Sequence, residues 1–157
     1  MAKSGMTLND ADRALLREIQ HDGRMTNQAL AEATAMSASA CWRRVQALEE
    51  SGIITGYTAR VDPRQAGLEF NALVQIVLSR AVPDAVMAFS AAVATRPEVL
   101  QCLSTTGTAD MVLRVVAADI EAYNRFLREF LHARPEVASV NTSVVLDVLK
   151  DSYELPL

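Results

Sequence analysis

The tetrapeptide RPEV occurs twice in this chain, as Arg96–Val99 and again 38 positions later as Arg134–Val137. At the same offset, apolar residues on both sides of the first copy align with apolar residues around the second. Apolar residues recur at helical spacing before each copy, and an apolar run follows it. Because proline has no N–H and disfavours helical geometry at the residue before it, each copy predicts the end of a helix and a return into a strand.

Strand-like runs also precede both predicted helices. Ala72–Leu78 comes before the first helix and Met111–Ala117 before the second, and both runs are rich in Val, Ile and Leu. The strands after the helices are expected at VLQCLST (99–105) and VASVNTSVVLDVL (137–149). Two βαβ halves joined by a turn at Gly107 predict a ferredoxin-like βαββαβ sandwich.

Within this sandwich, Val86, Phe89 and Val93 are expected to face inward from the first helix, and Asp119 to cap the second. Along the first strand, Leu73 and Val77 face one side of the sheet and Val74 and Ile76 the other, so both faces are apolar. Helices cover only one face of such a sheet. An exposed apolar sheet of this area favours a partner, and we predict a homodimer.

Residues 1–54 predict three helices. The first has an apolar stripe and Asn9 as its N-cap, the second begins after Thr26, and the third ends at Gly52. Helix, short turn, helix, with a third helix in front, is the spacing of a helix-turn-helix module.

The net charge of −4 argues weakly against nucleic acid as a partner. The segment from Ser37 to Leu48 nevertheless carries two arginines and no acid, with Ser39, Arg43 and Gln46 on one helical face and Arg44 beside them. Such an arginine suits a guanine edge. Phosphate contacts are expected at the start of the preceding helix, from Arg24, Thr26 and Asn27. The alternative is a solvated arginine face on an ordinary three-helix cluster.

Taken together, these residues resemble the Lrp/AsnC family of bacterial and archaeal transcription regulators. The resemblance runs from Leu8 to Leu157 and includes LNDADRALLREIQHDGRMTNQALAEATAMSASACWRRVQALEESGIITGYTARVDPRQAGL, PEVLQCLSTTGTADMVLRV, IEAYNRFL and VNTSVVLDVLK. It implies an α+β chain with three parts: a helix-turn-helix (winged-helix-like) DNA-binding domain over 1–54, a hinge strand over 55–68, and a ferredoxin-like effector-binding and oligomerisation domain over 69–157. Dimers assembling to octamers, double-stranded DNA and an amino-acid effector are the implied partners.

On the same basis, Ser37–Glu50 is expected to be the recognition helix. Ser37, Ser39, Arg43 and Arg44 are the expected DNA contacts, and Tyr57 and Arg60 in the linker are expected to contact phosphates. Three departures from the family pattern stand out. Ala35 occupies a turn position where glycine is common and where a left-handed alanine would cost roughly 1–2 kcal/mol. Asn9 replaces a usual aspartate, and Thr108 and Ala109 are smaller than the acidic and aromatic residues often found there.

The effector site of relatives lies at subunit contacts, around a turn that resembles TGTAD (106–110) here. Gly107 allows backbone N–H groups to approach a carboxylate, and Asp110 can pair with an ammonium group. The hydroxyls of Thr105 and Thr142 are expected on adjoining strands. The alternative is a plain hairpin turn with Asp110 as a local cap. The expected effector residues are Thr105, Gly107, Thr108, Ala109, Asp110 and Thr142.

Two rival functions remain open: a metabolite sensor without DNA binding, and an enzyme resembling tetrapyrrole decarboxylases of this architecture. Neither His21 nor His132 has a carboxylate placed to orient it, and no nucleophile, phosphate-loop or metalloprotease motif occurs, so no catalytic or metal residues are expected. We expect no cofactor. Two cysteines without a C-x-x-C pair, no apparent signal peptide and no long apolar run indicate a cytoplasmic protein with no membrane partner. The resemblance implies that it is bacterial and nucleoid-associated when bound to DNA.

Overall fold

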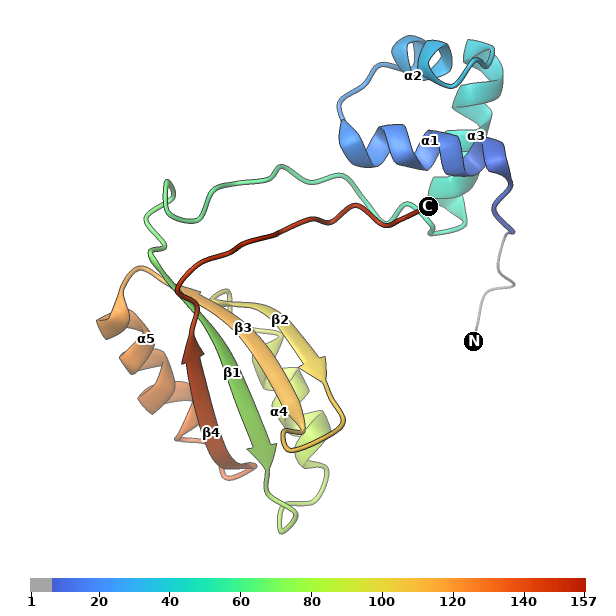
Figure 1. The fold of residues 1–157 in the computed structure, drawn as a ribbon. Coiled ribbons are helices and arrows are strands. Elements are labelled where there is room, and N and C mark those ends of the chain that lie inside the picture. The colour runs from blue at the N-terminus through green and yellow to red at the C-terminus, as the bar shows by residue number, and fades with distance from the viewer. Residues whose placement is uncertain (1–6) are drawn as a thin grey trace. The chain divides into compact units, whose positions relative to one another are not determined.

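The computed structural model describes residues 7–157, which form two compact units (Figure 1). Of the described residues, unit 1 contains 7–60 together with Lys150–Leu157, and unit 2 contains Val61–Leu149. The sequence placed 150–157 with the second domain, whereas in the structure these eight residues pack with the first. We call them the tail segment.

Unit 1 contains the three predicted helices, α1 (Asp10–His21), α2 (Asn27–Ala33) and α3 (Ala38–Glu50). The side chains of their N-cap residues Asn9, Thr26 and Ser37 accept hydrogen bonds from the first turn, as expected of Asn, Thr and Ser. Just after α3 and its C-cap Ser51, Gly52 takes a φ of 77° that suits glycine. The core contains Leu15, Leu30, Ala31 and Cys41.

The predicted hinge strand over 55–68 is wrong for the chain as described, because residues 55–68 form no strand. A strand requires a partner for its ladder of hydrogen bonds, and no segment within the described part of the chain pairs with this one. Its one turn, at Pro63, is closed by the Leu68 N–H, which donates to the Pro63 carbonyl at 2.8 Å.

Unit 2 is the predicted βαββαβ fold (Figure 1). Its elements are β1 (Phe70–Leu78), α4 (Ala85–Val93), β2 (Val99–Ser104), β3 (Met111–Ala117), α5 (Ile120–Phe126) with a π-helical turn η1 (Leu127–Leu131), and β4 (Val137–Val144). The sheet order is β2-β3-β1-β4, with every pair antiparallel. Inward residues of β1 and β3 pack with both helices in one core, so the helices share one face of the sheet.

Two expectations in unit 2 are wrong in detail. Val86 is 55% exposed, and Ala85 takes the inward position beside Phe89 and Val93. The last strand ends at Val144, not at residue 149. Val144 lies opposite Ala72 near the start of β1, so the following residues have almost no partner strand left.

The RPEV repeat brings two turns to one aromatic ring. The guanidinium groups of Arg96 and Arg134 lie 4.9 and 4.5 Å from the ring centroid of Phe130. Each arginine also donates to the glutamate two residues later, Arg96 to Glu98 at 2.8 Å and Arg134 to Glu136 at 2.9 Å. The two helix-to-strand turns are thus joined through Phe130 by cation–π contacts, which accounts for the repeated sequence.

The sheet face opposite the helices is open within the described chain. Leu73 on β1 is 44% exposed and Leu103 on β2 is 53% exposed, while Val77 and Val112 on the same face are partly buried.

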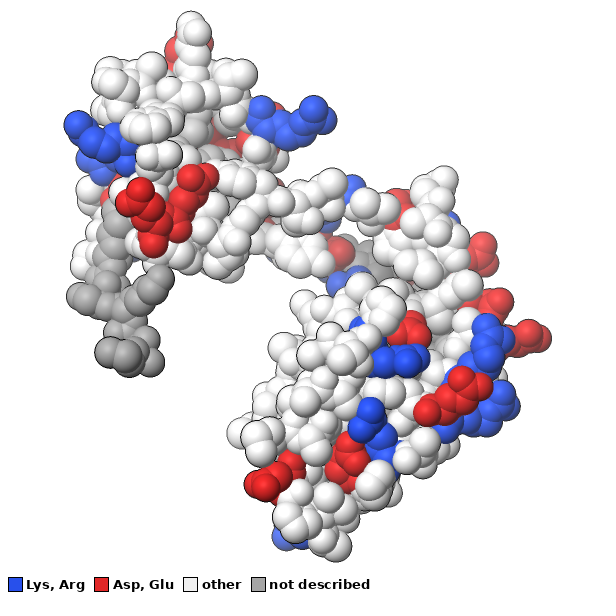
Figure 2. Space-filling view, turned by 180° about the vertical axis from the view of Figure 1, so that it is seen from behind, with Lys and Arg blue, Asp and Glu red and all other residues white. Residues whose placement is uncertain are grey.

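Figure 2 views the molecule from behind Figure 1 and shows blue and red residues interspersed over one side of unit 2, next to an area with neither. That uncharged area fits α4, which has no charged residue.

Candidate DNA interface and effector pocket

The outer face of α3 and its cap is polar and open to solvent. Ser37, Ser39, Arg43 and Gln46 are all exposed. The hydroxyls of Ser37 and Ser39 lie 3.3 Å apart, and Ser37 also accepts from the Ala40 N–H. Arg43 is a cation on a helix that carries no acid before Glu49. This helix start therefore presents short hydrogen-bonding groups and one long cation, the residue types that read base edges in a major groove.

Arg44 differs from Arg43, because it is bound inside unit 1. Its Nη1 donates to Oδ1 of Asp12 at 2.7 Å, and Asp12 is only 1% exposed. The other oxygen of Asp12 accepts from the Asn9 N–H at 3.2 Å, while the Asn9 side chain accepts from the Asp12 N–H at 3.0 Å. One carboxylate thus closes the capping box of α1 and holds α3. Sequence reasoning missed this pair.

The three residues expected to hold phosphates lie together at the start of α2, in different states. Arg24 is exposed, and only its backbone N–H is engaged, by Asp22. Thr26 accepts from the Ala29 N–H as the N-cap. The Asn27 side chain donates to the Ala38 carbonyl at 2.9 Å and so ties the start of α2 to the start of α3.

The linker candidates also have partners in unit 1. The Tyr57 hydroxyl donates to Glu49 Oε1 at 2.9 Å, and burial, with this hydrogen bond and the charge of Glu49, raises the pKa of the Tyr57 phenol. Arg60 donates to the backbone carbonyl of Asp151 at 2.9 Å. Both side chains are held in the described chain rather than free.

Ala35, in the turn between α2 and α3, adopts the left-handed conformation with a φ of 53°. The following N–H, that of Met36, donates back to the Ala31 carbonyl at 2.9 Å, which closes α2. The turn therefore requires the conformation that glycine adopts most easily, as the sequence suggested.

Unit 2 has a surface pocket of about 640 Å³ beside the predicted effector turn. This volume is within the range of small-molecule sites. Three segments line it: the end of β1 with the loop after it, the start of α4, and the turn before β3. The lining residues are Val77, Leu78, Ser79, Arg80, Val82, Asp84, Ala85, Val86, Met87, Gly107, Thr108 and Asp110.

Local hydrogen bonds shape the predicted turn. Asp110 Oδ2 accepts from the Leu78 N–H at 2.7 Å, and Thr105 donates to the Ala109 carbonyl at 2.9 Å. Ala109 is buried, whereas Gly107 has a φ of 115° and open space where a side chain would stand. The Asp110 carboxylate therefore binds the end of β1, 32 residues earlier in the sequence, and not its own turn. Asp110 is nevertheless exposed and lines the pocket, so it can hold β1 and also face a ligand.

The expectation that Thr105 and Thr142 lie on adjoining strands is wrong. Thr105 follows β2 and Thr142 lies on β4, the two opposite edges of the sheet. In a βαββαβ fold the first and third strands occupy the centre, which separates these two edges. Thr142 faces the helices and shares a hydrogen bond with the Tyr123 hydroxyl. It does not line the pocket.

Sequence reasoning missed the pocket residues contributed by the loop after β1. Arg80 is an exposed cation. Asp84 takes a left-handed φ of 53°, and its carboxylate does not cap α4. Met87 is 67% exposed on the first turns of α4. The only signal in the sequence was the Pro83-Asp84 pair before a helix, which predicts a turn but not a binding site.

Residues 7–157 contain no cluster of His, Cys, Asp or Glu that could hold a metal ion. No helix among them is long and apolar enough to cross a membrane.

Comparison with known proteins assigns both units. Residues 8–55 match the winged helix-turn-helix DNA-binding family, and residues 71–155 match the Lrp/AsnC ligand binding domain. The chain is 34% identical to the transcriptional regulator AzlB of Bacillus subtilis over 98% of both chains. It is 35% identical to the leucine-responsive regulatory protein of Escherichia coli, over 98% of this chain and 93% of that one.

Among solved structures, the transcriptional regulator NMB0573 of Neisseria meningitidis, in complex with L-Met, superposes with a TM-score of 0.92. It is 34% identical, over 96% of this chain and 97% of that one. Two matched domains in this order, with relatives that span nearly the whole chain, leave one assignment. The chain belongs to the Lrp/AsnC family, whose members are transcriptional regulators and not enzymes, with a DNA-binding helix-turn-helix and an amino-acid-responsive ligand-binding domain.

Proposed function

We propose that two copies of this chain form a symmetric regulator that reads two DNA half-sites and responds to an α-amino acid with an apolar side chain. The observation that carries the proposal is the exposed polar face of α3, from Ser37 to Gln46, which lies at the second helix of the motif. The amino acid would bind in the unit 2 pocket. While bound to DNA, the protein would be part of the nucleoid.

The residues of unit 1 divide into three roles. Arg43 reads a base edge, with Ser37 and Ser39 approaching the groove beside it. Arg24, Thr26 and Asn27 face phosphates at the start of α2, where backbone N–H groups add to the attraction. Tyr57 and Arg60 contact phosphates only after leaving their present partners. Arg44 we assign to positioning, because its guanidinium is bound to the buried Asp12.

The pairing of two copies rests on the open face of the sheet. Leu73 and Leu103 are large apolar side chains left exposed there, and a second copy would cover them by an isologous contact. The double variant Leu73→Asp/Leu103→Asp is expected to be a folded monomer by light scattering, with Ile120→Asp on the helix side as the control that stays dimeric. A dimer that survives the double variant places the contact elsewhere. Further association to an octamer is read from the same measurement.

The pocket chemistry favours a zwitterion with an apolar side chain. Arg80 can pair with a carboxylate, and Asp84 and Asp110 can pair with an ammonium group. Val82, Val86 and Met87 provide apolar contact for the side chain. Gly107 leaves room for close backbone approach. L-methionine is the first probe, because the Neisseria relative is described in complex with it. Thr108 lines the pocket and is smaller than the acidic residue often found there, which favours a larger effector.

DNA binding is tested by fluorescence anisotropy on the region upstream of the protein's own coding sequence. Arg43→Ala is expected to weaken binding by about 1–3 kcal/mol, the value of one bidentate base contact. Arg13→Ala, an exposed arginine on α1, is the control for loss of charge. Equal losses in both variants would reduce the effect to general electrostatics. If the unaltered protein binds L-methionine but does not bind DNA even at low salt, the metabolite sensor is favoured instead.

Effector binding is tested by titration calorimetry with L-methionine, L-leucine and L-glutamate. Asp110→Asn and Arg80→Ala are expected to lose affinity at least tenfold, and Arg128→Ala, on the π-helical turn η1, is the charge-matched control. A preference for L-glutamate would contradict the apolar lining. If the Arg80 and Asp110 variants bind the effector with unchanged affinity, the effector does not bind in this pocket.

A further inference from the structure

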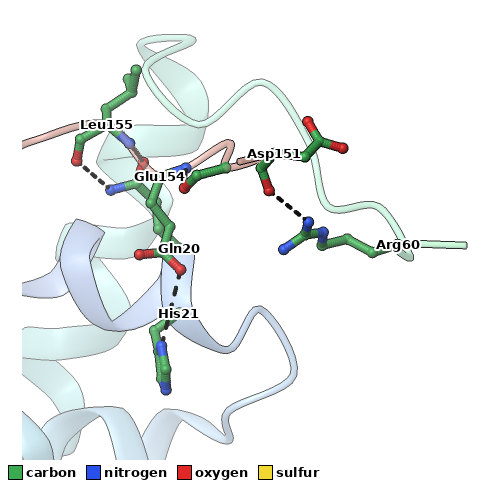
Figure 3. A network of polar contacts seen from close by, with 7 residues as sticks. Gln20, His21, Arg60, Asp151, Glu154 and Leu155 are labelled. Atoms are coloured by element: carbon green, nitrogen blue, oxygen red, sulfur yellow. Dashed lines mark hydrogen bonds and ion pairs between the residues drawn. The ribbon is translucent and has the colours of Figure 1, made fainter. Parts of the chain in front are cut away.

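The tail segment (residues 150–157) is held on the outer face of α1 by main-chain recognition. The Gln20 side chain accepts from the Leu155 N–H at 2.7 Å and donates to the Leu155 carbonyl at 3.3 Å (Figure 3). Arg17 donates to the carbonyl of Leu157 at 3.0 Å. One glutamine amide thus serves the extended tail as a neighbouring strand would, with one donor and one acceptor.

Three further contacts involve residues 151–154 of the tail. His21 Nδ1 lies 4.0 Å from Glu154 Oε1 (Figure 3). Arg60 donates to the Asp151 carbonyl at 2.9 Å, and its guanidinium lies 5.8 Å from the ring centroid of Tyr153. Arg60 is the last residue of unit 1 before the chain enters unit 2, and Lys150 is the first after it returns. Contacts therefore hold the tail along its length, from Asp151, which is bound by Arg60, to Leu157, which is bound by α1.

We propose that the outer face of α1 is a docking surface for the tail segment of the same chain, so that the chain connects the two units twice, through the linker and through residues 145–149. The occupant follows from proximity along the chain. Only residues 145–149 separate the end of β4 from the tail, and so short a tether keeps the effective concentration of the tail at α1 high. Individually weak, exposed hydrogen bonds then suffice to keep it docked.

The docked tail gives the two candidate sites a second connection along the chain, besides the linker. Val77 and Leu78 line the pocket on β1 and pair with Ser139 and Val137 on β4. β4 continues into the tail, which is bound to Arg17 and Gln20 on α1. At its other end, α1 holds α3 through Asp12 and Arg44. Under this proposal, a displacement of β1 and β4 on filling the pocket would reach α1 and α3 through residues 145–149 and the docked tail, as well as through the linker.

The docking is tested by disulfide trapping in a Cys102→Ser background, since Cys102 is exposed and Cys41 is buried. Gln20→Cys/Leu155→Cys is expected to form a reducible bond within one chain. Arg13→Cys/Leu155→Cys places the cysteine seven residues earlier on the same side of α1, about 10.5 Å away, and should not react. A bond between two chains identifies the tail of a second copy as the occupant and overturns the proposal. Absence of any bond overturns it as well.

The consequence for regulation rests on the proposed function and has its own readout. Arg17→Ala/Gln20→Ala should still bind DNA, while the effect of L-methionine on DNA affinity, typically 5–150-fold in coupled sites, falls toward onefold. Arg13→Ala should keep the full effect. An unchanged effect in the double variant refutes the tail as a route. If the unaltered protein shows no methionine effect, the proposed effector fails, and the disulfide result alone decides the docking.

Discussion

Replacing Ala35 by glycine should stabilise unit 1. Ala35 is exposed and has a φ of 53°, where a Cβ atom lies too close to the following carbonyl oxygen. This conformation costs alanine roughly 1–2 kcal/mol. Glycine removes that strain but adds about 0.4–1 kcal/mol of chain entropy to the unfolded state. The net gain expected for Ala35→Gly is therefore about 0–1.6 kcal/mol, because an exposed methyl group loses almost no burial.

The assay is urea unfolding followed by tryptophan fluorescence. Trp42 is the single tryptophan and lies on α3, so the signal reports unit 1 alone. Ala33→Gly, two residues earlier in the last turn of α2, is the matched control and should lose about 0.5–1 kcal/mol, since glycine weakens a helix. The two substitutions thus have opposite signs. A loss of stability in Ala35→Gly, comparable to that of the control, would refute the left-handed turn.

Three other predictions concern named side chains. Asp12→Ala and Arg44→Ala should each destabilise unit 1, and the double variant should lose at least about 0.5 kcal/mol less than their sum by urea unfolding, because the two groups are paired; additive losses contradict the pair. Arg44→Ala should also leave the salt dependence of DNA affinity unchanged, whereas a slope reduced by about 0.9 would reveal a direct phosphate contact. Burial alone would raise the pKa of the Glu136 carboxyl, but the bond from its own backbone N–H and the Arg134 guanidinium outweigh burial and lower that pKa. The stability that Glu136 contributes is therefore full above the ordinary glutamate pKa of about 4.3 and is lost as pH falls through the folded pKa. The free energies of unfolding of Glu136→Gln and the parent should therefore converge in acid. A difference between them that grows in acid would contradict the lowered pKa.

The helices and most strands could be predicted because their signals are local. Asn9, Thr26 and Asp119 cap the helices that they were expected to cap. The RPEV repeat indicated two matching half-domains, since a proline-terminated helix and an apolar run are readable from sequence. Strand order could be predicted only in part. Thr142 was wrongly placed on a strand next to that of Thr105, because adjacency in a sheet depends on topology.

Side-chain partners were the least predictable part. Arg43 and Arg44 are identical in type and adjacent, yet one is exposed and the other is bound to Asp12, 32 residues away. No periodicity distinguishes them, because the choice depends on how α1 packs on α3. The tail was missed for the same reason. Its bonds to Gln20 span 135 residues and use backbone groups, which carry no sequence signal.

Hydroxyl-radical footprinting, on a fragment selected by this protein from the genomic DNA of its host, tests the central claim most directly. A symmetric pair presenting Arg43 should protect two patches of DNA about one helical turn apart, or a multiple of it. Arg43→Ala should lose both patches together, and Arg13→Ala should keep them. A single protected patch, or two patches that persist without Arg43, would show that α3 does not enter the DNA in the way proposed.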